Sequence, residues 1–321
     1  MIDKIRIKKE LANVIKETNF HGFGKLERGK VRDSYIQKNR RILIVTDRIS
    51  AFDCILGTIP FKGQVLNQMA AFWFEHTSDI VSNHVLAVPD PNVMVVRECE
   101  QLPLEFIVRG YITGVTKTSA WYNYERGVRN FCGNILPEGL KKDQKLEKPI
   151  LTPTTKLEKH DRPISRDEAI AEGLIDAATF DKAAEICFKL YNRGVEIAAE
   201  RGLILVDTKY ELGKINGELV VSDEVNTPDS SRYWFSDTYH KLFAEGKDQR
   251  KLDKEYVREW LVEHGFRGEG TPPQLSEEVM IEAARRYIEA YELITGHKFV
   301  VYDEPSLPRI EKNLSPFRLS A

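Results

Sequence analysis

The pattern of apolar and polar positions predicts that the chain begins as a small β-rich lobe. Behind a charged, helically patterned N-terminal segment, apolar runs predict strands over residues 30–37, 41–46, 93–97 and 104–109, since such runs between turn signals are typical of strands. Leu102-Pro103 is a natural break before the last of these strands. We expect residues 47–53 to form an irregular loop and residues 65–76 a helix.

Helical periodicity is strongest in the middle and near the end of the chain. It predicts helices over residues 116–125, 166–172, 177–201 and 276–295, where Ser276 is a plausible N-cap and Gly296 ends the element. Strands first and mixed elements later indicate an α+β fold rather than repeated βαβ units. We expect lobes over residues 1–98 and 99–302, followed by an irregular tail at 303–321 with three prolines.

Asn216-Gly217 predicts a tight hairpin turn between apolar runs at residues 203–206 and 219–221. On the first strand Asp207, Lys209 and Glu211 share one face, because strand side chains alternate.

The partners of these residues depend on the hairpin register. In a strict register Glu211 lies opposite Ser222 and Lys209 opposite Glu224, whereas a bulge at Gly213 would bring Asp223 onto the face of Glu211. The local pattern does not choose between the two.

Crowded carboxylates on such a hairpin need a compensating charge. Two of them held about 4 Å apart repel by roughly 4 kcal/mol at an effective dielectric constant near 20. Mg²⁺ suits a few hard oxygen ligands together with phosphates. The plain alternative is a solvated acidic hairpin with ordinary cross-strand ion pairs.

The composition is that of an ordinary soluble protein of 321 residues, with a net charge near −2 that argues against bulk nucleic-acid binding. Four cysteines without a C-x-x-C pair, and histidines without metal-binding spacing, argue against a zinc site or a disulfide framework. No apolar run approaches the roughly 18 residues of a membrane span, so we expect a cytoplasmic protein without membrane contact.

Gly24 to Lys30 has the G-x-x-x-x-G-K spacing of a P-loop, but Val31 stands where Ser or Thr should bind magnesium. A strand follows, whereas P-loop phosphates lie at a helix N-terminus. A glycine-containing turn between strands can instead cover a nucleotide as in kinases, with Lys30 at a phosphate. The plain alternative is a surface hairpin with a solvated lysine.

Arg109, Ser119 and Arg232 are candidates for anion binding: a strand end, a predicted helix start and a polar turn. Arginine binds phosphate or carboxylate bidentately, and helix N-termini favour anions. The plain alternatives are a surface ion pair for Arg109 and a simple cap for Ser119. Residues 152–156, with His160-Asp161, form another polar loop that could be a connector.

Five sets of residues resemble one enzyme family, in the family's order and over most of the chain. They are residues 29–33 (GKVRD), 46–53 (TDRISAFD), 103–105 (PLE) with 108–114 (VRGYITG), 207–209 (DTK), and 223–225 (DEV) with 227–232 (TPDSSR). Together they resemble the SAICAR synthetase (phosphoribosylaminoimidazole-succinocarboxamide synthase) family of purine biosynthesis.

The resemblance implies a ligase that joins 5-aminoimidazole-4-carboxylate ribonucleotide (CAIR) to L-aspartate and converts ATP to ADP and phosphate. It implies two α+β lobes, the first kinase-like, with ATP in the cleft between them and adenine near residues 97–101. Oligomeric state is left open.

The motif match also implies site residues. ATP would contact Gly29, Lys30, Val31, Arg97, Lys209, Glu211 and Asp223, of which Glu211 and Asp223 would hold Mg²⁺. The match thus favours the bulged register. CAIR and aspartate would contact Ser50, Asp53, Arg109, Ser119, Lys156, Asp161, Asp229 and Arg232. Lys30, Lys209 and Asp229 would be the catalytic group. Arg109, Ser119 and Arg232 would chiefly bind the CAIR phosphate.

Residues 115–118 (VTKT), between Gly114 and Ser119, are a departure from shorter members of the family. Thr116 or Thr118 could therefore supply the hydroxyl in place of Ser119.

The implied chemistry needs an activated carboxylate, because oxide is a poor leaving group and an acyl phosphate is not. No residue looks like a covalent nucleophile or a convincing base, so we assign catalysis to positioning and to charge neutralisation by Mg²⁺, Lys30 and Lys209. A kinase is the rival enzyme, but its H-R-D-x-x-x-x-N and D-F-G signatures are absent. A nucleotide-sensing module would need no second anion site.

Overall fold

An antiparallel sheet lies at the centre of each of two units in the chain. The computed structural model describes residues 2–51, 54–156, 161–252 and 255–319. Unit 1 comprises Met1–Glu75, His84–Glu98 and Leu252–Ala321, and unit 2 comprises His76–Asn83 and Cys99–Lys251. The α+β class is confirmed. The lobe expected over residues 99–302 differs from unit 2, because the chain returns to unit 1 from Leu252 onward.

The five-stranded sheet of unit 1 has the order β1-β2-β3-β7-β6. Its strands are β1 (Lys25–Arg28), β2 (Arg32–Ile36), β3 (Arg40–Val45), β6 (Val85–Asp90) and β7 (Val93–Arg97). Tyr35, Ile42 and Val95 pack in its core. The strand predicted from residue 30 begins at Arg32 instead, which leaves Lys30 in the turn between β1 and β2.

A second hairpin in unit 1, β4 (Arg48–Ala51) and β5 (Cys54–Thr58), replaces much of the expected irregular loop. That expectation was wrong for residues 48–51. Arg48 interrupts the apolar pattern, yet it is buried through an ion pair of 2.8 Å with Asp33. The apolar pattern did not predict β4, because its Arg48 is charged and is buried in an ion pair with Asp33 of β2.

The helices of unit 1 are α1 (Lys4–Glu10), α2 (Lys62–His76, whose last residue begins unit 2), α7 (Glu255–Glu263), α8 (Glu277–Thr295) and α9 (Ser306–Leu314), with the 3₁₀ turn η1 (Ser315–Phe317). The predicted caps of α8 are confirmed: Ser276 Oγ accepts the Val279 N–H at 3.3 Å, and Gly296 has a φ of +73°.

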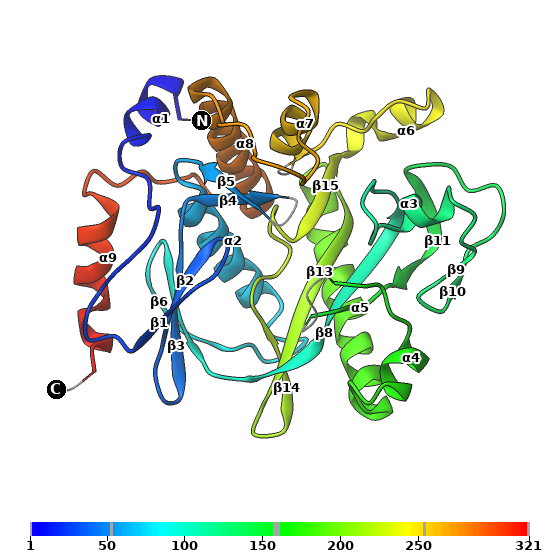
Figure 1. The fold of residues 1–321 in the computed structure, drawn as a ribbon, viewed down its shortest axis with the longest axis horizontal. Coiled ribbons are helices and arrows are strands. Elements are labelled where there is room, and N and C mark those ends of the chain that lie inside the picture. Colours follow the sequence, from blue (N-terminus) through cyan, green and yellow to red (C-terminus); the bar gives the residue numbers. More distant parts are fainter. Residues whose placement is uncertain (1, 52–53, 157–160, 253–254, 320–321) are drawn as a thin grey trace. The chain divides into compact units, whose positions relative to one another are not determined.

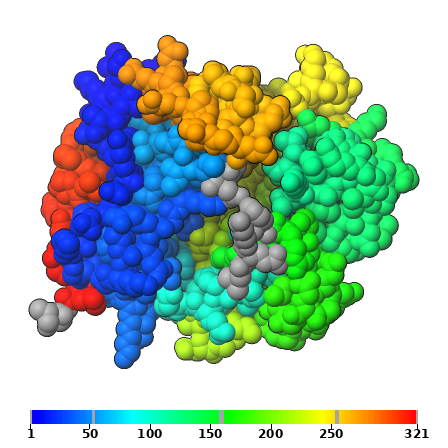
Figure 2. All heavy atoms as spheres, in the orientation of Figure 1, coloured from blue at the N-terminus to red at the C-terminus, as the bar shows by residue number. Residues whose placement is uncertain are grey.

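The expected irregular tail was wrong, because it contains α9. Ile310 and Leu314 of this helix are fully buried in the core that Ile15 and Phe23 share, so α9 lies beside the N-terminal segment (Figures 1 and 2). Two apolar residues one turn apart are too few to predict a helix from the sequence, but their burial in the core is sufficient to stabilise one.

The sheet of unit 2 has the order β11-β8-β13-β14, with β12 beside β8 and β15 beside β13. Its strands are β8 (Glu100–Ile112), β11 (Gln144–Leu151), β12 (Thr154–Thr155), β13 (Leu203–Ile215), β14 (Glu218–Ser222) and β15 (Ser231–Phe235), and β9 (Asn130–Phe131) pairs separately with β10 (Asn134–Ile135). The long strands β8 and β13 cross the middle of unit 2 together (Figure 1).

Strand β8 runs through Leu102-Pro103, where a break was predicted. The pairing with β13 shifts at this point, because Glu211 lies opposite Glu105 whereas Gly213 lies opposite Gln101. The extra residues of β8 form a bulge, where proline is tolerated because no ladder N–H is required. The Pro103 carbonyl still accepts a hydrogen bond of 3.1 Å from the backbone of the segment after β12.

The helices of unit 2 are α3 (Ala120–Tyr124), α4 (Arg166–Ala171), α5 (Ala177–Glu200) and α6 (Ser236–Ala244). Helix α3 starts later than predicted, because residues 116–119 form a turn in which the Ser119 N–H donates to the Thr116 carbonyl at 2.8 Å. In the described parts of the chain, every helix is too short or too polar to cross a membrane.

Candidate active site

Three charged side chains line the middle of β13. Asp207, Lys209 and Glu211 are two residues apart in a regular strand, so they point to the same face of the sheet. The pairing with β8 places Arg109 opposite Asp207 and Glu105 opposite Glu211. Strand register therefore gathers charged residues from segments about a hundred positions apart in the sequence.

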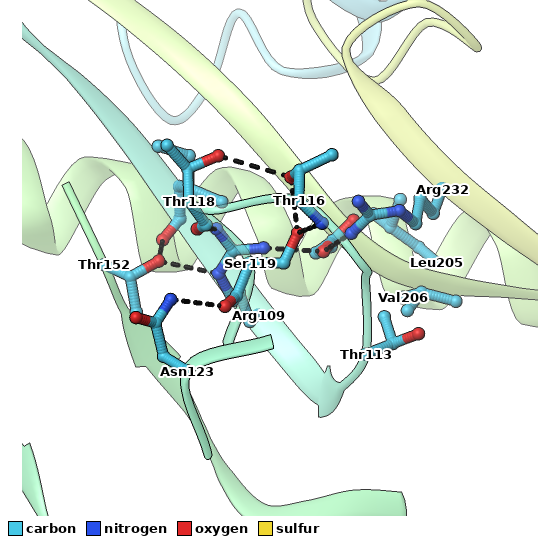
Figure 3. Close-up of polar contacts among 12 residues, drawn as sticks. Arg109, Thr113, Thr116, Thr118, Ser119, Asn123, Thr152, Leu205, Val206 and Arg232 are labelled. Carbon is cyan, nitrogen blue, oxygen red and sulfur yellow. Dashed lines mark hydrogen bonds and ion pairs between the residues drawn. The ribbon is translucent and has the colours of Figure 1, made fainter. Parts of the chain in front are cut away.

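Arg109 and Arg232 share the buried Asp207 carboxylate at one end of this row (Figure 3). Asp207 Oδ2 accepts hydrogen bonds from Arg109 Nη1 at 3.0 Å and from Arg232 Nη1 at 2.5 Å. Arg109 also donates from Nε to Thr152 Oγ1 at 2.7 Å and from Nη2 to the Thr118 carbonyl at 3.0 Å. The Arg109 side chain is 6% exposed, against 24% for Arg232. Arg109 thus anchors the group, and Arg232 is its more accessible cation.

The turn before α3 adds hydroxyl groups to the arginine pair. Gly114 has a φ of +92°, and a Cβ there would lie 2.4 Å from Ser119 Oγ and 3.1 Å from Arg232 Nη2, so the close approach requires glycine. Ser119 Oγ is buried and lies 2.8 Å from Thr116 Oγ1 (Figure 3). The structure therefore brings together the predicted phosphate contacts Arg109, Ser119 and Arg232, with the Thr116 hydroxyl beside them.

Two lysines and two glutamates alternate at the other end of the row. Lys209 Nζ donates to Glu105 Oε1 at 2.8 Å and to Glu211 Oε1 at 2.7 Å, and Lys156 Nζ donates to Glu211 Oε2. Burial would raise the pKa of Glu211, but Lys209 and Lys156 outweigh it and lower this pKa to about 2. Burial raises the pKa of Glu105 despite the charge of Lys209. Glu211 is therefore an ionised, largely buried carboxylate at neutral pH.

The β13–β14 hairpin has the strict two-residue register, so the bulged register was wrong. Glu211 pairs with Ser222 and Gly213 with Val220, without a shift between them. The irregularity next to Gly213 belongs to the pairing with β8 instead, because the excess residues lie around Pro103 on that strand.

Asp223 approaches the cluster by another route. Strand β14 ends at Ser222, and Asp223 has a φ of +63°, so the chain turns at this residue. Burial would lower the pKa of Lys209, but the charges of Glu211, Asp223 and Glu105 outweigh it and raise this pKa well above its ordinary value. Glu224 instead accepts a hydrogen bond of 2.8 Å from Thr227 Oγ1 in the following turn. Asp223, not Glu224, therefore adds its charge to the row.

Other predicted substrate residues lie around this row. The Asp229 N–H donates to Thr227 Oγ1 at 3.3 Å in the turn that leads into β15 and Arg232. The charge of Asp161 is one of those that raise the pKa of Glu105, after burial and the charge of Glu211. Of the polar loop noted between residues 152 and 161, residues 157–160 lie outside the described residues.

In unit 1, Gly29, Lys30 and Val31 form the turn between β1 and β2. Arg48 fixes this turn by donating from Nε to the Lys30 carbonyl at 3.1 Å and from Nη2 to the Gly29 carbonyl at 3.0 Å and to Asp33 Oδ1 at 2.8 Å. The Lys30 side chain is exposed. The backbone of the turn is thus held by buried groups, whereas its lysine faces solvent.

The remaining predicted residues of unit 1 are spread over other elements. Ser50 lies in β4, and Arg97 ends β7 opposite Arg40. Asp53 lies outside the described residues. The ligand contacts assigned to these residues and to the turn at Lys30 stay predictions.

Three supporting residues were missed as site residues: Asp207, Glu105 and Arg48. Asp207 had a signal, because it shares the strand face of Lys209 and Glu211. Glu105 and Arg48 lie within motif segments that were noticed, but only the fold shows that they bind Lys209 and the β1–β2 turn.

The carboxylates near Lys209 fit a hard cation. Glu211 and Asp223 offer oxygen ligands of the kind that Mg²⁺ prefers, and Glu211 has a pKa of about 2. Within the described ranges, no three or more His, Cys, Asp or Glu side chains gather closely enough to hold a metal by themselves. A cation bound there would complete its shell with water and phosphate oxygens, as Mg²⁺ commonly does.

Known proteins share this sequence and fold. A sequence model of the SAICAR synthetase family matches residues 25–274. Phosphoribosylaminoimidazole-succinocarboxamide synthase from Legionella pneumophila (strain Paris) is 49% identical over 286 residues, which cover 88% of this chain and 91% of that protein.

Solved structures agree. SAICAR synthase from Saccharomyces cerevisiae, complexed with SAICAR, is 34% identical with a TM-score of 0.78, covering 89% of this chain and 100% of that one. A SAICAR synthetase in complex with ADP is 25% identical with a TM-score of 0.66, covering 86% of this chain and 100% of that one. The resemblance seen in the sequence is confirmed, and the chain belongs to the SAICAR synthetase family.

Proposed function

We propose that this chain joins CAIR to L-aspartate with ATP, releasing SAICAR, ADP and phosphate, and that it does so through an acyl phosphate. Membership of the family makes the chain an ATP-dependent ligase of purine biosynthesis. One observation carries the proposed residue roles: an arginine pair and a lysine–carboxylate cluster line the same face of β13.

The arginine end of the row would bind the phosphate of CAIR. Arg232 supplies an accessible guanidinium, Arg109 supports it through Asp207, and Ser119 or Thr116 adds a hydroxyl donor. Asp207 and Glu211 are four residues apart, roughly 13 Å along a strand. A ribonucleotide held by its phosphate at Arg232 can therefore direct its base carboxylate toward the other end. The yeast relative in complex with SAICAR supports this use of the fold.

The lysine–carboxylate end would receive the phosphates of ATP. Glu211 and Asp223 would hold Mg²⁺, which supplies positive charge to the transferring phosphoryl group. The relative in complex with ADP supports nucleotide binding. Lys30 would contact the same phosphates from the exposed turn between β1 and β2. The reaction would take place in the cytoplasm, and the partners of the enzyme would be small molecules.

Two bond exchanges give the product. A carboxylate oxygen of CAIR attacks the γ-phosphorus as its bond to the ADP oxygen breaks. The neutral amine of aspartate then attacks the acyl carbon, the bond to phosphate breaks, and the amine proton leaves to solvent. Lys209 stays protonated, because three carboxylates raise its pKa well above the ordinary value against the effect of burial. It therefore acts as a fixed positive charge rather than as the base.

Product analysis tests the proposal. ADP release should require CAIR and L-aspartate together, and ¹⁸O placed in the carboxylate of CAIR should appear in the released phosphate. Steady ADP release that ignores aspartate would refute the ligase reaction and point to a kinase or a hydrolase. Unlabelled phosphate formed in an aspartate-dependent reaction would refute only the acyl phosphate.

A further inference from the structure

We propose that Lys156 is an internal counter-cation of Glu211 which a divalent metal ion displaces, so that this lysine sets the metal affinity of the site. The inference rests on the proposed role of Glu211 as a metal ligand. Both oxygens of the Glu211 carboxylate bind an ammonium group: Lys209 Nζ donates to Oε1 at 2.7 Å, and Lys156 Nζ donates to Oε2. A metal ion that binds Glu211 therefore competes with a lysine.

Lys209 is the more firmly bound of the two lysines. It lies within β13 and donates to Glu105 Oε1 at 2.8 Å as well as to Glu211. Lys156 lies just beyond β12, and in the part of the chain that the structure describes Glu211 is its one ionic partner. Displacing Lys156 breaks one ion pair, whereas displacing Lys209 breaks two. The exchange is therefore easier at Lys156.

The charges around Lys209 favour the same exchange. Glu105, Glu211 and Asp223 contribute three negative charges that act on Lys209, and the two lysines supply two positive ones. A divalent ion in place of Lys156 would make this group neutral. If Lys156 stayed, the metal ion would be a third cation on a carboxylate that already binds two ammonium groups, and it would repel both lysines.

The local backbone allows the side chain of Lys156 to leave by itself. The Lys156 N–H donates to the Pro103 carbonyl at 3.1 Å, and the preceding Thr155 pairs with Leu104 of β8. The Lys156 side chain is 27% exposed. It can therefore turn toward solvent by rotamer changes while β12 stays paired.

Mn²⁺ binding to the protein without nucleotide or substrates measures this competition directly, with free Mn²⁺ followed by electron paramagnetic resonance. Lys156→Met keeps the length of the side chain and removes its charge. This variant should bind Mn²⁺ about ten-fold more tightly, a factor that corresponds to the lower end of the free energy of a hydrogen bond to a charged group. Lys156→Arg keeps the charge and should bind like wild type. Lys148→Met, at an exposed position of β11, is the matched control and should change nothing.

Glu211→Gln separates the two levels of the proposal, and circular dichroism should show first that every variant is folded. If Glu211→Gln weakens Mn²⁺ binding while Lys156→Met leaves it unchanged or weaker, Lys156 is no competitor and only this inference fails. If Glu211→Gln binds Mn²⁺ like wild type, Glu211 is no metal ligand, and the metal site under the proposed function fails as well.

Discussion

Arg232→Lys should weaken binding of CAIR and leave binding of ATP intact. Arg232 is the accessible member of the arginine pair, with a side chain that is 24% exposed and an Nη1 that lies 2.5 Å from Asp207 Oδ2. Lysine keeps the positive charge and can still pair with Asp207. It lacks the planar fork through which arginine binds a carboxylate and a phosphate at once.

The size of the effect follows from the lost contact. A hydrogen bond to a charged group is worth about 1.5–3 kcal/mol, and each 1.4 kcal/mol is a factor of ten in affinity. Binding of CAIR should therefore weaken by about 10- to 100-fold. The fold should be nearly unaffected, because Arg109 keeps its own bonds to Asp207 and Thr152.

Calorimetric titration with CAIR, and separately with its nucleoside that lacks the phosphate, measures the contribution of the phosphate. Wild type should prefer CAIR strongly, and Arg232→Lys should lose most of this preference. Arg250→Lys is the control, because that guanidinium lies 3.7 Å from the centre of the Phe235 ring in the same unit. An unchanged preference in Arg232→Lys would refute the assignment, and an equal loss of ATP binding would indicate general damage.

Three further predictions concern the carboxylates. In steady-state assays Asp223→Asn should lose far more turnover than Glu224→Gln, since Asp223 acts on Lys209 whereas Glu224 bonds within its own turn; equal losses would contradict this. Arg309→Met should lower the urea-unfolding free energy by about 3–5 kcal/mol. The Nε of Arg309 lies 2.9 Å from the buried Asp90 carboxylate, and the substitution removes this ion-pair partner. A loss below about 1 kcal/mol would refute a stabilising pair. Burial raises the pKa of Asp47 from 3.8 to about 6, so the folded state binds this proton more tightly, and the stability contributed by Asp47 should fall by about 2 kcal/mol as pH rises from 4 to 6. Asp47→Asn should lack that fall in urea titrations across this range, and an unchanged pH dependence would contradict the shifted pKa.

Much of the local structure could be predicted from neighbouring residues. Asn216-Gly217 specified the turn between β13 and β14, and side-chain alternation placed Lys209 and Glu211 on one face. Ser276 and Gly296 marked the ends of α8. These features depend on backbone preferences and hydrogen bonds within a few residues, so they can be predicted from the local sequence.

The assembly of the site could not be predicted from the local sequence. Arg109 and Asp207 meet because β8 and β13 pair in one particular register, and the bulge that sets this register lies around Pro103 rather than at Gly213. The motif match gave both arginines a role, but it contained no distance and no carboxylate between them.

The same limit explains Arg48, the helix α9 and Lys156. Each has its partner far away in the sequence: the carbonyls of the β1–β2 turn for Arg48, the core around Ile15 for α9, and Glu211 for Lys156. A buried charge or a short helix has a free energy that depends on its surroundings. Local pattern therefore decided most of the helices and strands of this chain, whereas long-range packing decided the β4–β5 hairpin, α9 and which charges face one another.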